Sequence, residues 1–350
     1  MAIKKKIRVL IVDDSLFMRS FIAAQLEKDA ALEVAGVASD PYEARDKILE
    51  LNPDVMTLDI EMPKMNGVEF LKRLMPQHPL PVVVVSSAAE AALDALDAGA
   101  LDFVSKADMK SELERKHFIS ELIVKIKVAS IARLGGRKNA ASKKSSVAPD
   151  AAPDKLLIAA AASTGGTDAV HTLLKALGDD VPGIVIVQHM PPGFTRLYAE
   201  RLNSSCAMEV REAKDKDDII KGRAYIAPGG MHMKVEKTRR GYRVRCFEGE
   251  KVSGHCPSGD VLFNSVAEAA GKNALGIILT GMGADGAKGL LNMKNAGAAT
   301  IGQSRESCVV FGMPKVAGEL GATDRFMDIE DMSGSIYQWL GVSGADKRRG

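Results

Sequence analysis

The first 130 residues alternate between short apolar runs and stretches with helical periodicity. Apolar side chains recur on one face at Phe17, Phe21, Ile22 and Leu26, which is the spacing of an amphipathic helix. Strands and helices that alternate in this way predict a doubly wound parallel sheet of five βα units. The expected strands are Ile7–Val12, Val34–Ala38, Val55–Leu58, Val82–Val85 and Phe103–Ser105.

A second alternating pattern begins at Lys155 and predicts a second α/β domain with a mostly parallel sheet. Its expected strands are Leu156–Ala160, Ile184–Val187, Ala224–Ile226, Ile277–Thr280 and Ala299–Gly302. Its expected helices are Asp168–Leu177, Thr195–Asn203, Asp260–Ala270 and Gly286–Ala296. We therefore expect a two-domain α/β protein.

The segment between the two patterns differs in composition. Residues 129–153 scatter Lys and Arg among Gly, Ala and Ser, and they contain Pro149 and Pro153. Such a composition is typical of a flexible basic linker that acts as a solvated spacer. We therefore expect a first domain over residues 1–128 and a second domain over residues 154–350.

Polar and charged residues follow four of the expected strands of the first domain. Asp13 and Asp14 follow the first strand, Asp59 the third, Ser86 the fourth and Lys106 the fifth. Because the carboxyl ends of parallel strands share one edge of the sheet, these side chains should converge. Three carboxylates in one pocket repel one another unless they are neutralised, which predicts a bound Mg²⁺. Lys106 would pair with a phosphorylated aspartate, and the Ser86 hydroxyl would hydrogen-bond the phosphoryl group.

With these residues in place, residues 7–107 resemble the receiver domain of bacterial response regulators. The resemblance implies that Asp59 is the phospho-acceptor and that a histidine kinase donates the phosphoryl group. It also implies a Mg²⁺ site formed by Asp14, Asp59 and the Glu61 carbonyl, with Asp13 assisting through water.

In the second domain, a turn of small residues around Ser163 joins an expected strand to an expected helix. Gly165 and Gly166 permit backbone angles that are closed to other residues, so the turn would expose the serine hydroxyl. A serine nucleophile needs a base, which is itself oriented by a carboxylate. The same Ser-Thr-Gly-Gly turn also fits a phosphate cradle or a plain turn, and no G-x-S-x-G elbow is present.

His189 and Asp285 are the candidates for the base and the carboxylate. Each follows an apolar strand, so Ser163, His189 and Asp285 would meet within hydrogen-bonding reach at one sheet edge. The pattern by itself makes this a plausible triad. His232 and His255 are not paired with a set of metal-ligating residues and could line the cleft.

Residues 155–342 resemble the catalytic domain of the CheB family of chemotaxis protein-glutamate methylesterases. A receiver domain upstream on the same chain is also the architecture of that family. The matching motifs are Ala162–Thr167, Gln188–Arg201, Ala227–Met233, Pro257–Phe263, Leu279–Gly286 and Val310–Pro314.

This resemblance implies a serine hydrolase in which Ser163 is the nucleophile, His189 the general base and acid, and Asp285 the residue that orients the imidazole. It places the backbone N–H of Met282 in the oxyanion hole, with Thr164 beside the nucleophile. The implied reaction is phosphorylation-activated hydrolysis of glutamate γ-methyl esters on chemoreceptors, which releases methanol. Deamidation of receptor glutamines is the implied companion activity, adaptation in chemotaxis is the implied role, and the catalytic domain is expected to need no cofactor.

Three features depart from the family patterns. Ala107 follows Lys106 where receivers usually have proline, and the segment over residues 87–99 is shorter than usual. Ala161 stands where the methylesterases often have glycine, and alanine is the smallest possible change. We therefore keep the expectation of activity for the second domain.

Composition argues against several other classes of protein. The 350 residues are 46% hydrophobic and 26% charged with a net charge of +2, so no overall field attracts nucleic acid. The first apolar stretch is broken by Arg8 and ends at Asp13, which is too short for a signal peptide or a membrane span. The four cysteines form no C-x-x-C pair, which favours a reducing compartment. We expect a cytoplasmic, monomeric protein without membrane insertion.

Three other functions compete with the hydrolase interpretation. A DNA-binding response regulator would need a helix-turn-helix output module, and the sequence shows none. A nucleotide-phosphate cradle would need a G-x-G-x-x-G or a Gly-Lys-Ser/Thr signature, and neither is present. An adaptor with the same fold but without the chemistry can be separated from an enzyme only by assay.

Overall fold

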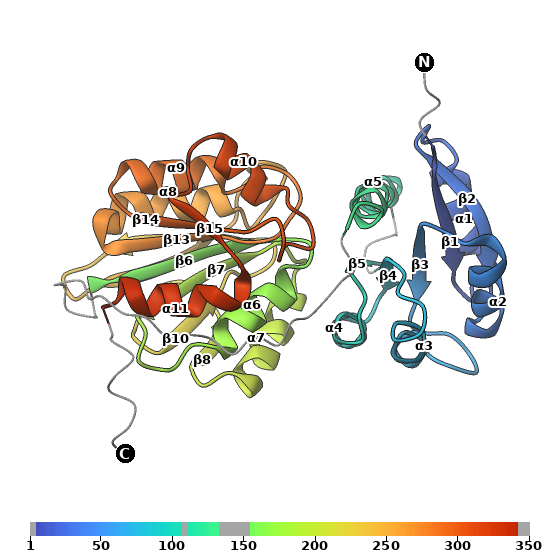
Figure 1. The fold of residues 1–350 in the computed structure, drawn as a ribbon, viewed down its shortest axis with the longest axis horizontal. Helices are drawn as coiled ribbons and strands as arrows, with labels where there is room; N and C mark the ends of the chain where they lie inside the picture. The colour runs from blue at the N-terminus through green and yellow to red at the C-terminus, as the bar shows by residue number, and fades with distance from the viewer. Residues whose placement is uncertain (1–4, 107–110, 133–154, 342–350) are drawn as a thin grey trace. The chain divides into compact units, whose positions relative to one another are not determined.

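The computed structural model of the protein describes residues 5–106, 111–132 and 155–341. The chain divides into two compact units, residues 1–135 and 136–350 (Figure 1). Within the described residues, no helix is both long enough and apolar enough to cross a bilayer. The expected domain boundaries stay predictions, because most of the expected linker lies outside the described ranges.

The first unit is a five-stranded parallel sheet with the strand order β2-β1-β3-β4-β5. Its strands are β1 (Ile7–Val12), β2 (Leu32–Ala38), β3 (Val55–Asp59), β4 (Val82–Ser86) and β5 (Asp102–Ser105). Its helices are α1 (Leu16–Leu26), α2 (Pro41–Leu51), α3 (Gly67–Leu74), α4 (Ala89–Asp97) and α5 (Glu112–Ala129). The doubly wound fold is confirmed, and each predicted strand lies within an observed one.

The central strands of this sheet are fully buried, and a tight turn follows β3. Every residue of β3 and β4 is buried, as expected where helices cover both faces of a parallel sheet. A Cβ at Gly67 would lie 2.5 Å from the carbonyl oxygen of Asp59, so glycine is required where α3 begins. The loop after β3 therefore folds back tightly against the end of that strand.

The second unit contains a seven-stranded sheet with the order β15-β14-β13-β6-β7-β10-β8, and its strand pairs are all parallel. Its strands are β6 (Leu157–Ala162), β7 (Ile184–Gln188), β8 (Glu209–Glu212), β10 (Arg223–Ile226), β13 (Ala274–Ile278), β14 (Ala299–Gln303) and β15 (Arg325–Met327). Its α-helices are α6 (Gly166–Lys175), α7 (Phe194–Ser205), α8 (Gly259–Ala270), α9 (Ala287–Asn295), α10 (Met313–Glu319) and α11 (Ile329–Trp339). Helices α8, α9 and α10 cover one face of the sheet, and α6, α7 and α11 cover the other (Figure 1). The predicted mostly parallel sheet is confirmed, although β13 ends before Leu279, which had been expected to belong to it.

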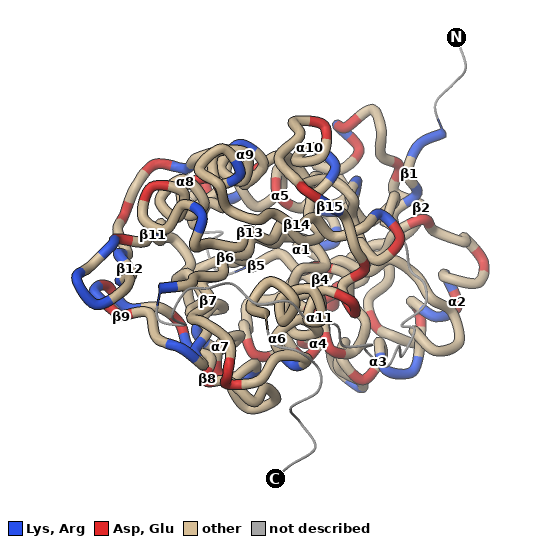
Figure 2. The backbone as a smooth tube through the Cα atoms, turned by 60° about the vertical axis from the view of Figure 1, so that its left-hand side comes forward, with Lys and Arg blue, Asp and Glu red and all other residues tan. Residues whose placement is uncertain are grey.

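A three-stranded antiparallel sheet, ordered β11-β12-β9, belongs to the same unit and was not predicted. Its strands are β9 (Asp218–Ile219), β11 (His232–Lys237) and β12 (Tyr242–Phe247). Val244 and Cys246 are buried whereas Arg243 and Arg245 are partly exposed, which is the period-two pattern of a half-buried strand. The strands could have been predicted from this alternation of apolar and charged residues. Basic residues gather around the β11–β12 hairpin (Figure 2).

Strand β6 is the central strand of the seven-stranded sheet, and all of its residues are buried. It pairs with β13 on one side and with β7 on the other. A Cβ at Gly259 would lie only 2.9 Å from the Cβ of Ala161, so a glycine at the start of α8 faces the alanine. The methyl group of Ala161 is therefore accommodated where many relatives are expected to have glycine.

We predict that Gly165→Ala lowers the free energy of unfolding of the second unit by about 3 kcal/mol. The φ angle of Gly165 is +73°, and a Cβ there would lie 2.6 Å from the Cβ of Val309. Gly321→Ala is the matched control, because its φ is +71° but nothing lies within 4 Å of the added Cβ. The control should cost only about 1 kcal/mol. Urea unfolding followed by circular dichroism measures both, and equal losses would contradict the steric argument.

Candidate active site and phosphorylation site

The turn that carries Ser163 begins directly after β6 and is held by hydrogen bonds on both sides. The Ser163 N–H donates to the carbonyl oxygen of Thr280 at 3.0 Å. Its carbonyl oxygen accepts from Gln188 Nε2 at 2.9 Å and from the Gly166 N–H at 2.7 Å. The side chain of Ser163 is free of these contacts and partly exposed, so the turn presents a hydroxyl at the end of a fully buried strand.

His189 follows β7, the neighbour of β6 in the sheet. Ala162 pairs with Gln188 in register, and the His189 N–H donates to the Ala162 carbonyl oxygen at 3.1 Å. Ser163 and His189 are thus the next residues of two adjacent parallel strands, whose backbones lie about 4.8 Å apart. The predicted meeting of these residues at one sheet edge follows from this register.

Asp285 lies in the loop between β13 and α9 and is almost fully buried, with 1% of its surface exposed. Its Oδ2 lies 2.8 Å from His189 Nε2 and accepts from the Gly259 N–H at 2.6 Å. Its Oδ1 accepts from Ser258 Oγ at 2.6 Å and from the Asp260 N–H at 3.1 Å. Burial raises the pKa of Asp285, but hydrogen bonds from His189, Ser258 and Gly259 outweigh it and hold the pKa below its ordinary value.

The expected hydrogen bond between Ser163 and His189 is absent from this conformation. His189 Nδ1 is buried and has no hydrogen-bond partner among the described residues, while Nε2 is engaged with Asp285. The Ser163 hydroxyl moves by rotation about a single bond, and catalytic hydrogen bonds are often unformed before substrate arrives. Two of the three predicted side chains are therefore in direct contact, and the third stands at the next strand end.

The residues expected beside the oxyanion differ in their surroundings. Thr164 is buried, and its carbonyl oxygen accepts from Thr280 Oγ1 at 3.1 Å. A Cβ at Gly281 would lie 2.7 Å from the Cβ of Ser163, so the loop backbone just before Met282 passes directly against the serine. The Met282 side chain is 42% exposed. The backbone of this loop therefore adjoins the serine.

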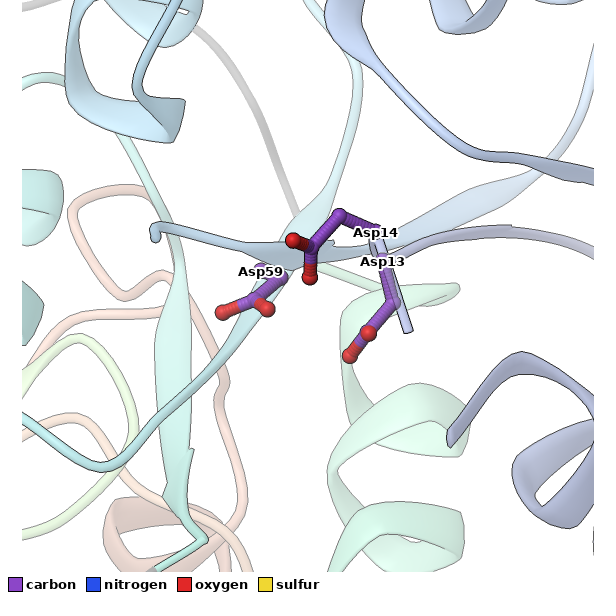
Figure 3. A group of neighbouring side chains, drawn as sticks. All are labelled: Asp13, Asp14 and Asp59. Carbon is purple, nitrogen blue, oxygen red and sulfur yellow. The ribbon is translucent and has the colours of Figure 1, made fainter. Parts of the chain in front are cut away.

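In the first unit, Asp13, Asp14 and Asp59 converge as predicted (Figure 3). One carboxylate oxygen from each lies within 4.8 Å of those of the other two. Lys106 Nζ lies 2.7 Å from Asp13 Oδ2 and 2.7 Å from Asp59 Oδ2. Three oxygen donors at this spacing suit a hard divalent cation such as Mg²⁺, so the side chains fit the ion that the fold implies.

The charges in this pocket perturb one another. Burial raises the pKa of Asp59, and the nearby charge of Asp13 raises it further, against the opposing effect of Lys106. Burial lowers the pKa of Lys106, but hydrogen bonds and charge from Asp13 and Asp59 outweigh burial, and the net shift is upward. Lys106 therefore stays charged and partly neutralises the carboxylates.

Ser86 and Lys106 lie beside each other at the ends of β4 and β5. The Lys106 N–H donates to the Ser86 carbonyl oxygen at 2.9 Å, and Ser86 Oγ accepts from the Ala88 N–H at 3.1 Å. The Glu61 N–H contacts Asp59 Oδ1 at 3.4 Å, which places the next loop at the same pocket. Ala107 lies outside the described residues, and the short segment after Ser86 still forms α4.

Sequence reasoning missed the donors that hold Asp285. Ser258, Gly259 and Asp260 belong to a motif that the sequence singled out, but only by its likeness to a family. Ser258 Oγ also caps α8 by accepting from the Val261 N–H at 3.4 Å. A Ser that precedes an apolar helical run is a recognisable N-cap, so its position was predictable, although its bond to Asp285 was not.

We predict that Asp285→Asn lowers the free energy of unfolding of the second unit by about 3 kcal/mol at neutral pH, because charged acceptors make strong hydrogen bonds. The folded-state pKa of Asp285 is depressed, so its stabilisation is fully present above the unfolded pKa of about 3.9. This stabilisation is lost as pH falls through the folded-state pKa of Asp285. The difference in the free energy of unfolding between the wild type and Asp285→Asn should therefore shrink over that pH range. Urea unfolding across a pH series measures this difference.

Asp324→Asn is the control for that experiment. The pKa of Asp324 is also lowered, because bonds from Thr300 and Lys294 outweigh its burial, yet its side chain is more exposed. Asp324→Asn should therefore lower the free energy of unfolding by less than Asp285→Asn does. A loss at Asp285 that stays the same down to the most acid pH would contradict the role given to its charge.

Comparison with known proteins identifies both units. The CheB methylesterase family model matches residues 158–336, and the response regulator receiver domain model matches residues 9–117. A protein-glutamate methylesterase/protein-glutamine glutaminase 2 of Syntrophomonas wolfei is 53% identical over 336 residues, covering 96% of this chain and 98% of the relative. A protein-glutamate methylesterase/protein-glutamine glutaminase of Salmonella typhimurium is 45% identical over 332 residues, covering 94% and 95%.

Among solved structures, the crystal structure of the Thermotoga maritima CheB methylesterase catalytic domain is similar to the second unit. It has a TM-score of 0.51 at 34% sequence identity and covers 52% of this chain and 97% of that one. The relatives match along nearly their whole length, and both family models occur in the expected order. The chain therefore belongs to the CheB family of protein-glutamate methylesterases, with an N-terminal response-regulator receiver domain and a C-terminal methylesterase domain.

Proposed function

We propose that this protein is a phosphorylation-activated protein-glutamate methylesterase that hydrolyses glutamate γ-methyl esters on chemoreceptors and serves adaptation in chemotaxis. The observation that carries the proposal is the 2.8 Å contact between His189 and the buried Asp285 at the strand end next to Ser163. The names of the relatives support the choice of substrate. The same groups would cleave an amide, so deamidation of receptor glutamines is part of the proposal.

In the proposed reaction, Ser163 Oγ attacks the ester carbonyl carbon and His189 accepts the hydroxyl proton. With Nε2 engaged by Asp285, Nδ1 is the ring nitrogen left to take that proton. Asp285 keeps the imidazole in this tautomer and stabilises the imidazolium that forms. Before any substrate binds, Nε2 is therefore engaged with Asp285, while Nδ1 has no hydrogen-bond partner among the described residues.

The negative charge that develops on the carbonyl oxygen needs donors that are already in place. Backbone N–H groups of the loop at Met282 and of the turn after Ser163 are the proposed donors, with Thr164 beside them. The proton on His189 then passes to the departing methoxy group, which leaves as methanol. Water, deprotonated by His189, releases the free glutamate from Ser163 in the second half of the cycle.

The receiver domain is proposed to control this reaction through Asp59. A histidine kinase would donate the phosphoryl group, and Mg²⁺ held by Asp14, Asp59 and the Glu61 carbonyl, with Asp13 acting through water, would neutralise charge during transfer. A phosphoryl group adds about −1.5 to −2 charges. Lys106 now pairs with Asp13 and Asp59, so it would re-pair with the phosphoryl group.

The remaining parts of the proposal concern place and partners. The protein is proposed to act as a cytoplasmic monomer on chemoreceptors, with a histidine kinase as its phosphodonor and without nucleic acid as a ligand. The catalytic domain is proposed to work without a cofactor, since Ser163, His189 and Asp285 supply nucleophile, base and orienting carboxylate. The linker over residues 129–153 would join the two activities.

We predict that Ser163→Ala lowers methanol release from methylated receptor membranes by at least about 10³-fold, because the nucleophile is lost. A small phosphodonor with Mg²⁺ should stimulate the wild type and leave Ser163→Ala inactive. Asp59→Asn is the matched control, which should keep the basal rate and lose only the stimulation. Chelation of Mg²⁺ should have the same effect as Asp59→Asn. Wild-type activity in Ser163→Ala would overturn the proposed chemistry.

We also predict that removal of residues 1–140 raises basal esterase activity. The proposed reason is that the unphosphorylated receiver inhibits the catalytic domain, and phosphorylation relieves the inhibition. Methanol release by the truncated and full-length proteins, each without phosphodonor, measures the effect. An equal or lower rate after truncation would argue against inhibition by the receiver while leaving the hydrolase itself intact.

A further inference from the structure

A second histidine stacks on the proposed catalytic base. The rings of His189 and His255 lie with their centroids 3.7 Å apart and their planes within 7° of parallel. His255 comes from the segment between β12 and α8, far from His189 in the sequence. One face of the His189 imidazole is therefore covered by another planar ring.

The chain around His255 forms a tight, specific turn. The Val252 N–H donates to the His255 carbonyl oxygen at 3.0 Å, and the His255 N–H donates to the Val252 carbonyl oxygen at 2.9 Å. The two residues between them, Ser253 and Gly254, have φ angles of +52° and +83°. Positive φ at both central positions is the signature of the tight two-residue turn found in β-hairpins. The turn therefore fixes the backbone position of His255.

The turn is anchored to the same helix start that holds Asp285. Ser253 Oγ donates to Asp260 Oδ2 at 2.9 Å, and Asp260 is buried with its Oδ1 accepting from the Gly289 N–H at 2.8 Å. The Asp260 N–H donates to Asp285 Oδ1 at 3.1 Å. Asp260 therefore connects the turn that precedes His255 to the hydrogen bonds that hold Asp285.

We propose that His255 is a positioning residue for the esterase reaction, an inference that rests on the proposed function. The torsion that turns a histidine ring is broad, so one hydrogen bond to Asp285 does not by itself fix the plane of the ring. The stacked ring of His255 supplies the second constraint. It keeps His189 Nε2 on Asp285 and Nδ1 available for the Ser163 hydroxyl.

The test compares His255→Ala, which removes the ring, with His255→Phe, which keeps a flat ring without its nitrogens. Full-length protein is assayed for methanol release, and the rate at which a fluorophosphonate probe labels Ser163 is measured separately. Loss of an aromatic pair predicts that His255→Ala lowers kcat and the labelling rate by about three- to tenfold with KM unchanged. His255→Phe should restore most of both. Ser253→Ala, which loosens the turn, should show a smaller loss in the same direction.

Two results would overturn the inference. One is a labelling rate and a kcat in His255→Ala equal to those of the wild type. The other is a His255→Phe variant as slow as His255→Ala, because the rate would then depend on the imidazole nitrogens of His255 and not on the stacking. Melting temperatures close to that of the wild type exclude loss of folding, and Ser253→Ala decides the matter if His255→Ala does not fold. Failure of the probe to label wild-type Ser163 would instead overturn the proposed function.

Discussion

The buried carboxylate of Asp285 is the constraint on which the candidate active site depends. A charge removed from water is costly unless hydrogen bonds compensate it, and Asp285 receives them from His189, Ser258, Gly259 and Asp260. These partners belong to the end of β7 and to the start of α8. Because the carboxylate needs all of them, the two segments and the loop after β13 are held in one arrangement.

Compensation of buried charges also organises the receiver domain. Asp13 and Asp59 are buried beside Lys106, whose ammonium group bonds both of them. A cluster with one cation and three carboxylates is poised for a change of charge, since a divalent cation or a phosphoryl group alters which pairs are favourable. In both domains the chemistry sits at the carboxyl ends of parallel strands, where backbone ends and helix starts leave room for polar side chains.

Much of this could be predicted because strand ends can be recognised along the chain. Asp13, Asp59, Ser86 and Lys106 each follow an apolar run, and the strands of the receiver were predicted within a few residues. The antiparallel β11-β12-β9 sheet was missed, since β9 has only two residues and β11 ends in exposed charged residues, although the alternation along β12 is a recognisable strand pattern. The beginning of α8 was recognised only through a motif, and its role as the support of Asp285 was not foreseen.

The sequence by itself determined the alternation of strands and helices that builds the two parallel sheets, and the candidate residues that stand at the strand ends, because these depend on local periodicity and on the rules of parallel sheets. Only the tertiary structure decided which of those residues touch. It placed His189 Nε2 on Asp285, left Nδ1 without a partner among the described residues, and stacked His255 on the imidazole. The physical reason is that hydrogen bonds and ring contacts depend on distances of a few ångströms between segments far apart in the chain, and no spacing along the sequence records those distances.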